Sequence, residues 1–565
     1  MGTEGDHGGA AGSVTDDDAS ASQQVGLLRG EDVRRKCCGA KLETTHALVV
    51  TCVSGIGLLT DLFDFNVINI AKLLLQELYG DMTAYQEGML TGAALIGAVI
   101  GQFCFGYVAD IIGRRTTFLA SALLTLIGAL GSACSFPITE DKGSIYTMLI
   151  IWRFVMGVGI GGEYPLSAAN TAEGVDHKSS GQSLAAVYSM QGVGKMLAPL
   201  MFVILLGCGA SYELAWRLGF GAGAVLSGIG LVLRSKELKE TEDFEEVQAR
   251  RMQQRLANPE ASEDGPGKLS SAWLIPLAGT AVSWFLYDVV DYGLGLYSGD
   301  ILGADDDPFD AAAAVLAVNA IALPAFFLGI YLVRDDVLGR RDSQVVGFTG
   351  MMVIFVILVI TEGSVWKETG SGAGRELKFP HGFSYWVFLM LYTTQLVFDA
   401  SGPGMSTYVI PGEIFPTRMR GTCHGISAAS GKIGAVVGSF GFPAMRELTG
   451  LGSVMLLNAV VTGVAMFLTF LLTPAYTSTE VGLLKEVARD GGDEAAVVLL
   501  YKGPMIREDL RRDGQDAGPA TTTSSWMKDC SRRLFMYASP MRVAQAPAED
   551  YVTNVIANEL RDSRL

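Results

Sequence analysis

The sequence contains little charge for its length. Aspartate, glutamate, lysine and arginine make up 18% of the 565 residues, whereas hydrophobic residues make up 49%. Several ordinary soluble domains would carry about 25% charged residues, so the composition argues against them. The eight cysteines lack the spacing of a metal site or a disulfide framework, and no secretory signal is visible. No nucleophile–base pair is evident either, so we expect no enzyme, no metal site and no cofactor.

Long apolar stretches are present instead of charge. A helix needs about 20 apolar residues to cross a bilayer, and such stretches recur along the whole chain. They lie near 46 to 72, 84 to 109, 115 to 136, 144 to 172, 181 to 208, 213 to 234, 272 to 302, 309 to 333, 343 to 362, 383 to 411, 421 to 445 and 452 to 473. The sequence therefore predicts an all-α membrane protein with twelve transmembrane helices.

Polar segments divide these helices into two groups of six. We predict a disordered cytoplasmic tail at 1–45, a six-helix bundle at 46–234, a partly helical cytoplasmic linker at 235–271, a second bundle at 272–473 and a cytoplasmic tail at 474–565. Lysine and arginine gather in the short loops of one face, which marks that face as cytoplasmic. Both termini should therefore be cytoplasmic, and we expect a multi-pass protein of the plasma membrane.

The two groups repeat one charged turn. "GYVADIIGRR" (106–115) and "VRDDVLGRR" (333–341) align Asp110 with Asp336 and Gly113 with Gly339 at a shift of 226 residues. "TDLFDF" in the first helix and "YDVVDY" in the seventh align at a shift of 227. These landmarks predict two pseudo-symmetric six-helix bundles that rock around a binding site between them.

The repeated turn also suggests a gate. Asp110 with Arg114, and Asp336 with Arg340, place a carboxylate and a guanidinium at the end of a helix. Such groups can bond across neighbouring helix ends in one conformation and separate in the other. The alternative is that the arginines only fix the topology of the chain.

Acidic residues also lie inside the predicted helices. A charged side chain at the bilayer centre costs about 2.5–3.5 kcal/mol on insertion scales, so it normally faces a cavity or a partner. Asp61 and Asp64 are one helical turn apart, as are Asp288 and Asp291. Glu163 follows Arg153 by ten residues in the fourth helix. These acids either serve function or hold the bundles together by pairing with Arg153, Lys195 or Lys432.

The functional interpretation couples protons to an anion. Ionised carboxylates repel an anionic substrate by several kcal/mol at about 4 Å in a low-dielectric site, and protonation removes that repulsion. Lys432 and Arg153 can supply compensating positive charge. The residues therefore favour a transporter driven by the proton gradient, with an anion, protons and the lipid bilayer as its partners and no nucleic acid.

Three longer segments resemble a known family. With the DxxGRR turns and twelve helices, the chain is similar to the major facilitator superfamily over roughly 45–475. "WRFVMGVGIGGEYPLSA" (152–168), "WFLYDVVDYG" (284–293) and "PGEIFPTRMRGTCHGISAASGKIGAVVGSF" (411–440) resemble its phosphate:proton symporters. The resemblance implies phosphate-binding roles for Tyr164, Gln191, Trp284, Asp288 and Tyr292, proton-handling roles for Asp61, Glu163 and Asp288, and a role of Lys432 in substrate binding or coupling. We add Asp64 and Arg153 to the proton-coupling residues.

The chain departs from that family at three positions. Glu163 replaces the usual aspartate, "ASGPG" (400–404) replaces "NFGPN" so that Gly404 should leave a gap, and Asp291 has no usual counterpart. Glu163 and "WFLYD" also resemble fungal glycerophosphodiester permeases. Three functions therefore remain: import of inorganic phosphate with protons by alternating access, import of a glycerophosphodiester or other small organic anion, or a nutrient receptor on the same fold that does not transport.

Overall fold

The protein is almost entirely helical in the computed structural model, which describes residues 16–140, 142–257, 269–295, 307–370, 376–490, 492–513 and 546–562. The first group of membrane helices is α1 (Asp16–Tyr79), α2 (Ala84–Ile112), α3 (Arg114–Ala133), α4 (Ser144–Gly174), α5 (His177–Gly207) and α6 (Tyr212–Glu237). The second group is α8 (Leu274–Gly295), α10 (Pro308–Leu332), α11 (Arg340–Ile360), α12 (Ser384–Asp399), α14 (Arg420–Thr449) and α15 (Leu451–Leu472).

Ten of the described helices are long and apolar enough to cross a membrane. The other two membrane helices are polar or interrupted. α14 carries Arg420, His424 and Lys432, and α12 continues through a π-helical turn, η4 (Ala400–Gly404), into α13 (Met405–Ile414). The predicted all-α membrane fold is confirmed, and the interruption lies at "ASGPG", where Pro403 cannot donate a helical hydrogen bond.

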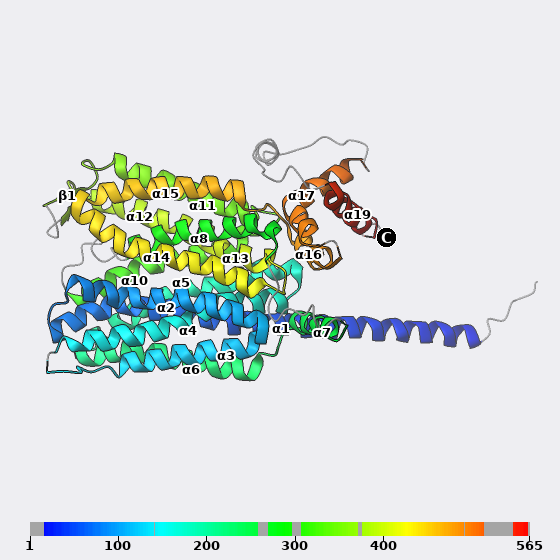
Figure 1. Ribbon diagram of the computed structural model, residues 1–565, viewed down its shortest axis with the longest axis horizontal. Helices are drawn as coiled ribbons and strands as arrows, with labels where there is room; N and C mark the ends of the chain where they lie inside the picture. Colours follow the sequence, from blue (N-terminus) through cyan, green and yellow to red (C-terminus); the bar gives the residue numbers. More distant parts are fainter. Residues whose placement is uncertain are drawn as a thin grey trace, which may run out of the picture. The chain divides into compact units, whose positions relative to one another are not determined.

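Helices far apart in the sequence join the two groups. Within the first group α4 packs on α2 and α3, and within the second α14 packs on α8. Between the groups, α2 packs on α14 and α5 packs on α10, as the ribbon shows (Figure 1). These are the second helix with the eleventh and the fifth with the eighth. A twofold operation that maps the first six helices onto the last six exchanges these two contacts, so the duplication seen in the sequence is also present in the packing.

The repeated turns both depend on glycine. Gly113 has φ 115° and Gly339 has φ 81°, backbone conformations that side chains with a Cβ atom rarely adopt. Each glycine lets the chain reverse and start the next helix at an arginine, Arg114 in α3 and Arg340 in α11. We call the end of the helices that carries these two turns the turn face.

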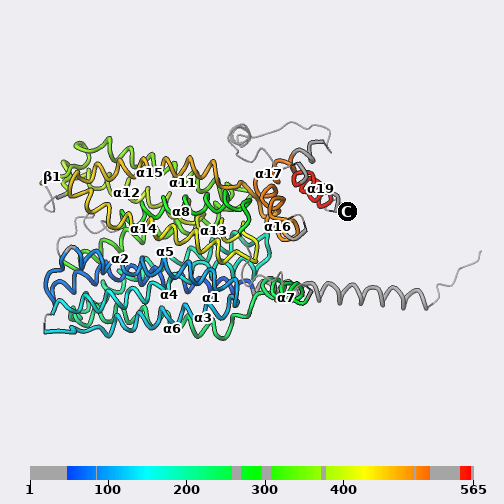
Figure 2. Tube along the Cα trace, viewed as in Figure 1, coloured from blue at the N-terminus to red at the C-terminus, as the bar shows by residue number. Residues whose placement is uncertain are grey.

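Further helices lie at the turn face. The segment between the two groups contains α7 (Glu242–Ala257), and the C-terminal segment forms α16 (Ser478–Asp490), α17 (Gly492–Asp513) and α19 (Ala546–Asp562). Val487, Leu499 and Ile556 of these helices pack with Trp273 of a 3-10 turn, η2 (Ser271–Trp273), and with Phe415. The trace shows α7, α16, α17 and α19 at one end of the membrane helices (Figure 2).

Two smaller features complete the fold. The loop after α11 forms an antiparallel hairpin of β1 (Lys367–Thr369) and β2 (Glu376–Lys378), which Glu368 ties to Arg446 at the far end of α14. The backbone is helical from Asp16, where the sequence predicts a disordered tail, because alanine, glutamine and leucine in this stretch favour a helix. Residues 1–15 lie outside the described residues.

Candidate functional site

The two aspartates of α1 are buried inside the helix bundle. Asp61 and Asp64 are 1% and 0% exposed, and none of their four carboxylate oxygens has a hydrogen-bond partner among the described residues. The Asp64 side chain points at α6, where only a glycine, Gly223, leaves room for it. Both acids therefore face the protein interior, as their spacing predicts.

Glu163 has a partner that the sequence did not suggest. Arg234 of α6 donates to both of its carboxylate oxygens at 2.6 Å, and both side chains are 2% exposed. The two residues are 71 positions apart, and Arg234 stands at the end of a predicted helix, where it resembles an ordinary boundary cation. This bidentate pair is the strongest geometry available to two such groups.

Arg153 pairs with the backbone instead. It donates to the carbonyls of Leu90 at 2.8 Å and Asp64 at 3.4 Å, and its Nη2 has no partner in the described part of the chain. Its guanidinium thus ties α4 to α1 and α2. The interpretation that Arg153 forms an ion pair with one of the acids is therefore wrong, since the guanidinium binds two backbone carbonyls.

A second cluster joins α8 to α14. Lys432 donates to Asp288 and to the Tyr292 hydroxyl, each at 2.9 Å, and its ammonium lies 5.2 Å from the centre of the Tyr164 ring. Trp284 packs against Tyr164 with ring centres 6.0 Å apart. Five of the six predicted substrate-binding residues therefore lie together. The sixth, Gln191, is buried on α5, and its Nε2 has no partner among the described residues.

A cavity of about 100 Å³ opens beside this cluster. It lies between the two groups and toward the end opposite the turn face, because Asn69 and Gly295 of its lining are near the far ends of α1 and α8. A water molecule needs about 10–15 Å³ by this kind of measure, so several waters or a small anion fit. Of the predicted substrate residues, Tyr292 lines the cavity.

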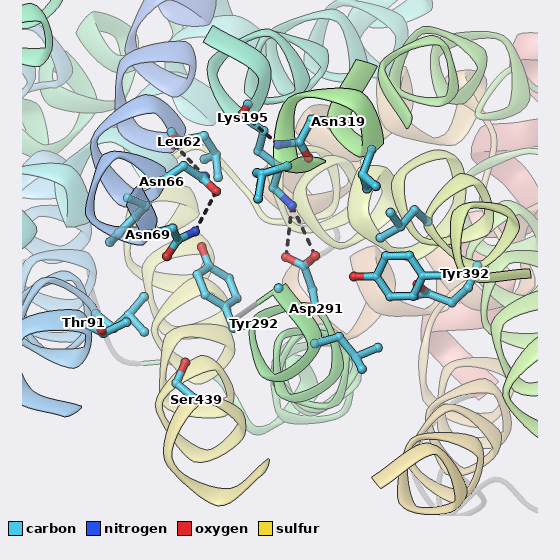
Figure 3. Close-up of a pocket in the computed structure, with 18 residues that line it drawn as sticks. Leu62, Asn66, Asn69, Thr91, Lys195, Asp291, Tyr292, Asn319, Tyr392 and Ser439 are labelled. Carbon is cyan, nitrogen blue, oxygen red and sulfur yellow. Dashed lines mark hydrogen bonds and ion pairs between the residues drawn. The ribbon is translucent and has the colours of Figure 1, made fainter. Parts of the chain in front are cut away.

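The cavity also contains an ion pair between Lys195 and Asp291, one of the pairings that the sequence leaves open for the acids of the first and seventh helices. Lys195 of α5 donates to both carboxylate oxygens of Asp291 at 3.2 and 3.3 Å, and Asn319 of α10 donates to the Lys195 carbonyl at 3.0 Å. Figure 3 shows this ion pair in the cavity, with the Tyr392 hydroxyl directed toward Asp291. In the sequence, Asn66, Asn69 and Asn319 stand in apolar helices, and such buried amides could have indicated a polar cavity.

The gap expected at Gly404 is filled. A Cβ atom added there would lie 2.9 Å from the hydroxyls of both Tyr188 and Tyr287. Tyr188 belongs to α5 and Tyr287 to α8, so the two groups meet at this glycine. Gly404 therefore makes room for tyrosines of this chain, and the expectation that it enlarges the pocket is wrong.

The first DxxGRR turn connects the two groups at the turn face. Asp110 pairs with Arg114 at 2.5 Å and accepts hydrogen bonds from the backbone of Gly421 and Thr422 at 3.1 and 2.7 Å, at the start of α14. Arg114 also bonds to the Thr417 carbonyl at 2.7 Å. Glu173, which the sequence analysis did not assign to the gate, bridges Arg114 and Arg420 at 3.1 Å each. These buried contacts hold the turn face closed.

The second turn is built differently. Arg340 pairs with Glu413 at 2.9 Å and with Asp335, whereas Asp336 is exposed, pairs with its neighbour Arg334, and has its pKa lowered by that arginine. The prediction that Asp336 and Arg340 form the gate of the second turn is therefore wrong, because Asp335 pairs with Arg340 in place of Asp336. α2 continues to the residue before Gly113, whereas α10 ends at Leu332, seven residues before Gly339. The residues between Leu332 and Gly339 therefore leave the helix, and in this non-helical segment Asp335, not Asp336, reaches Arg340.

Comparison with known proteins decides the family. The family model of the Major Facilitator Superfamily matches residues 54–409. The chain belongs to the Major Facilitator Superfamily. Within it, the chain belongs to the inorganic phosphate transporters: it is 31% identical to low affinity inorganic phosphate transporter 8 of Medicago truncatula, over 79% of this chain and 91% of the relative. It is 30% identical to probable inorganic phosphate transporter 1-6 of Arabidopsis thaliana, over 79% and 94%.

Solved structures agree on the fold. The proton:xylose symporter XylE bound to 6-bromo-6-deoxy-D-glucose superimposes with a TM-score of 0.64 at 18% identity, covering 77% of this chain and 98% of XylE. The human organic anion transporter MFSD10 gives a TM-score of 0.54 at 15% identity, covering 75% and 99%. From the family match and the relatives, the protein is an integral multi-pass membrane transporter of the major facilitator type and not an enzyme.

Among the described residues, contacts between the two groups close this facilitator at the turn face. Asp110, Arg114 and Glu173 join its two groups at the turn face, whereas the cavity separates them at the other end.

Proposed function

We propose that this facilitator imports inorganic phosphate together with protons by alternating access. The observation that carries the proposal is Lys432, a buried cation held between Asp288 and Tyr292, of which Tyr292 lines the cavity. The phosphate transporters to which it is related carry this substrate in their names. An oxyanion requires such a cation, and a charged hydrogen bond to it is among the stronger kinds available.

Protonation of Asp288 would release that cation. The ionised carboxylate of Asp288 accepts one of the hydrogen bonds that the Lys432 ammonium can donate, and it neutralises the charge of that ammonium. When Asp288 takes a proton, the charge of Lys432 becomes available to phosphate, and Tyr292, Tyr164 and Trp284 offer donors without adding charge. Phosphate binding then favours the protonated state and proton binding favours the phosphate-bound state, as linkage requires.

Asp61 and Glu163 would complete the proton path. Asp61 lies within electrostatic range of Glu163, Arg234 and Lys432, between the two clusters. Its carboxylate has no partner in the described residues, so a proton can compensate its burial. Glu163 is held by Arg234, and a proton on either acid would change how strongly that arginine is shared. Asp64 and Arg153 would support Asp61 from the next helical turn.

The direction of transport follows from orientation. Arginine and lysine concentrate at the turn face, which would make that face cytoplasmic, so the cavity would open to the outside and the termini would lie in the cytoplasm. We propose the plasma membrane as the location. The driving force would be the proton gradient, with no cofactor.

Uptake by proteoliposomes tests the proposal. The purified protein should accumulate labelled phosphate when the outside is acidified. Asp288→Asn should reduce this accumulation by more than about tenfold, equivalent to about 1.4 kcal/mol, yet exchange of labelled for unlabelled phosphate should continue because asparagine imitates the protonated acid. Asp336→Asn, at the exposed position of the second turn, is the matched control and should behave as the unmodified protein.

Two results would contradict this assignment. Undiminished pH-driven accumulation by Asp288→Asn would remove the role of that residue. Saturable phosphate binding by the unmodified protein without any uptake would favour the receptor function instead.

A further inference from the structure

A second set of charged side chains lies beside the Asp288–Lys432 cluster. Asp291 of α8 and Lys195 of α5 form an ion pair in the cavity, and Asp399 stands at the end of α12. Lys195 belongs to the first helix group, whereas both aspartates belong to the second. This charged triad therefore spans the boundary between the two moving halves, toward the cavity and away from the turn-face contacts.

Asp399 is the unsatisfied member of the triad. Its side chain is 3% exposed, and its Oδ1 has no hydrogen-bond partner among the described residues. The Tyr287 hydroxyl is its hydrogen-bonding neighbour and lies 3.4 Å from the Tyr188 hydroxyl of α5. A carboxyl group buried in this way is stable only if a cation or a proton compensates it.

The cation nearby is already engaged. Lys195 bonds to Asp291 through both carboxylate oxygens, and Asp399 forms no ion pair in the described part of the chain within salt-bridge distance. Two carboxylates thus share one ammonium. One negative charge remains without compensation unless one of the acids carries a proton.

A buried amide supports a route from the cavity to this acid. Gln395 is 1% exposed, lines the cavity, and has an Oε1 atom without a partner in the described residues. It lies one helical turn before Asp399, so the two side chains share a face of α12. The π-helical turn η4 begins directly after Asp399, and such turns occur often at functional sites.

The surroundings of Asp399 define what can act on it. The titratable groups that face it are Asp288, Asp291 and Tyr287 of α8, Lys195 and Tyr188 of α5, and Tyr392 of its own helix. α10 faces the cavity with Asn319, which does not titrate, and α11, which packs on α12, has no titratable residue between Ser343 and Ile360.

We propose that Asp399, beside the ion pair of Asp291 and Lys195, is a further proton-binding site, which holds one proton in the conformation described here. A proton suits the site better than a metal ion, because no group of three acidic, histidine or cysteine residues that could hold a metal is found among the described residues. Loss of the proton leaves two carboxylates competing for Lys195, which belongs to the other half. The charge state of this site therefore controls an ion pair between the two halves.

The coupling of this proton to uptake rests on the proposed function, but the proton site does not. Infrared spectroscopy of the protein in lipid detects the C=O band of protonated carboxyl groups during a pH titration. Asp399→Asn should remove one such band, and Lys195→Met should add one because Asp291 loses its cation. Asp310→Asn, an exposed acid at the start of α10, is the control and should leave the bands unchanged. Unchanged bands in Asp399→Asn would overturn the proposal, as would a band that responds to sodium and not to pH.

Transport provides the second measurement. In proteoliposomes, the ratio of protons to phosphate obtained from the reversal potential should be lower in Asp399→Asn than in the unmodified protein, and Asp399→Glu should restore it. An equal ratio would overturn the coupling. If the unmodified protein carries no phosphate, the infrared titration still decides whether the proton site exists.

Discussion

The pair of Glu163 and Arg234 shows how much one buried side chain depends on a distant partner. Each group is almost fully removed from water, and Glu163 binds both terminal nitrogens of Arg234, whose Nε has no partner among the described residues. Removing one partner of such a pair leaves an unpaired charge, which typically costs about 3–5 kcal/mol, whereas replacing both by apolar groups is often neutral. The buried Asp61 has no such partner, and the charges of Glu163 and Arg234 both act on its carboxylate.

We therefore predict that Arg234→Met strongly destabilises the protein. The expected loss is about 3–5 kcal/mol at a pH where Glu163 stays ionised, seen as a lower melting temperature in detergent. The double variant Glu163→Gln with Arg234→Met should recover most of the loss. If Arg234→Met alone has the same melting temperature as the unmodified protein, water or another cation replaces Arg234.

The contact of α2 with α14 shows how element packing sets the closed turn face. A Cβ atom on Gly106 would lie 2.5 Å from the Gly421 carbonyl, and one on Gly425 would lie 2.4 Å from the Gln102 carbonyl. Small residues on both helices let the two backbones touch, as is common between membrane helices. This close approach brings Asp110 within reach of the first backbone amides of α14.

Gly106→Ala should therefore force these helices apart. We expect weaker closure at the turn face, measured as a longer and broader distance between spin labels on α2 and α14. Gly221→Ala is the matched control, because nothing lies within 4 Å of the added Cβ atom there. If both variants give the same distances, α2 and α14 are not in contact in the membrane.

The closed end of the protein as a whole is asymmetric. The first turn is hydrogen-bonded to the opposite half through Asp110 and Arg114. The second turn packs on the opposite half through Arg340 and Gly181 of α5, but it is hydrogen-bonded to the C-terminal helices, because Arg340 and Asp335 both bond to Ser478. Lys485 of α16 also forms an ion pair with Asp243 of α7. Opening of the turn face must therefore break direct contacts on one side and move the C-terminal helices on the other.

This asymmetry gives a prediction for two aspartates that occupy matching positions in the repeat. Asp110→Asn should weaken the closed state by about 1.5–3 kcal/mol, the range for hydrogen bonds to a charged group, and speed hydrogen exchange of the amides at 421 and 422. Asp336→Asn should leave exchange there unchanged. Equal effects of the two variants would mean that Asp336, like Asp110, bonds to the opposite half.

The elements that depend on local physics can be predicted from the amino-acid sequence. Apolar runs long enough for a bilayer predict the membrane helices, the charge of the loops suggests the orientation, and the repeated turn reveals the duplication. Acids in apolar helices also indicate the interior positions of Asp61, Asp64 and Asp288, because lipid tolerates no isolated charge.

Tertiary structure alone decided which charges meet. Glu163 binds Arg234 across 71 residues and Lys432 binds Asp288 across 144, and no local pattern encodes these separations. The choice of Asp335 over Asp336 depends on where α10 ends, and the filled space at Gly404 depends on two tyrosines from other helices. A hydrogen-bonded ion pair forms only when its two groups lie within about 4 Å, so partners are fixed by how the helices pack and not by their order in the chain.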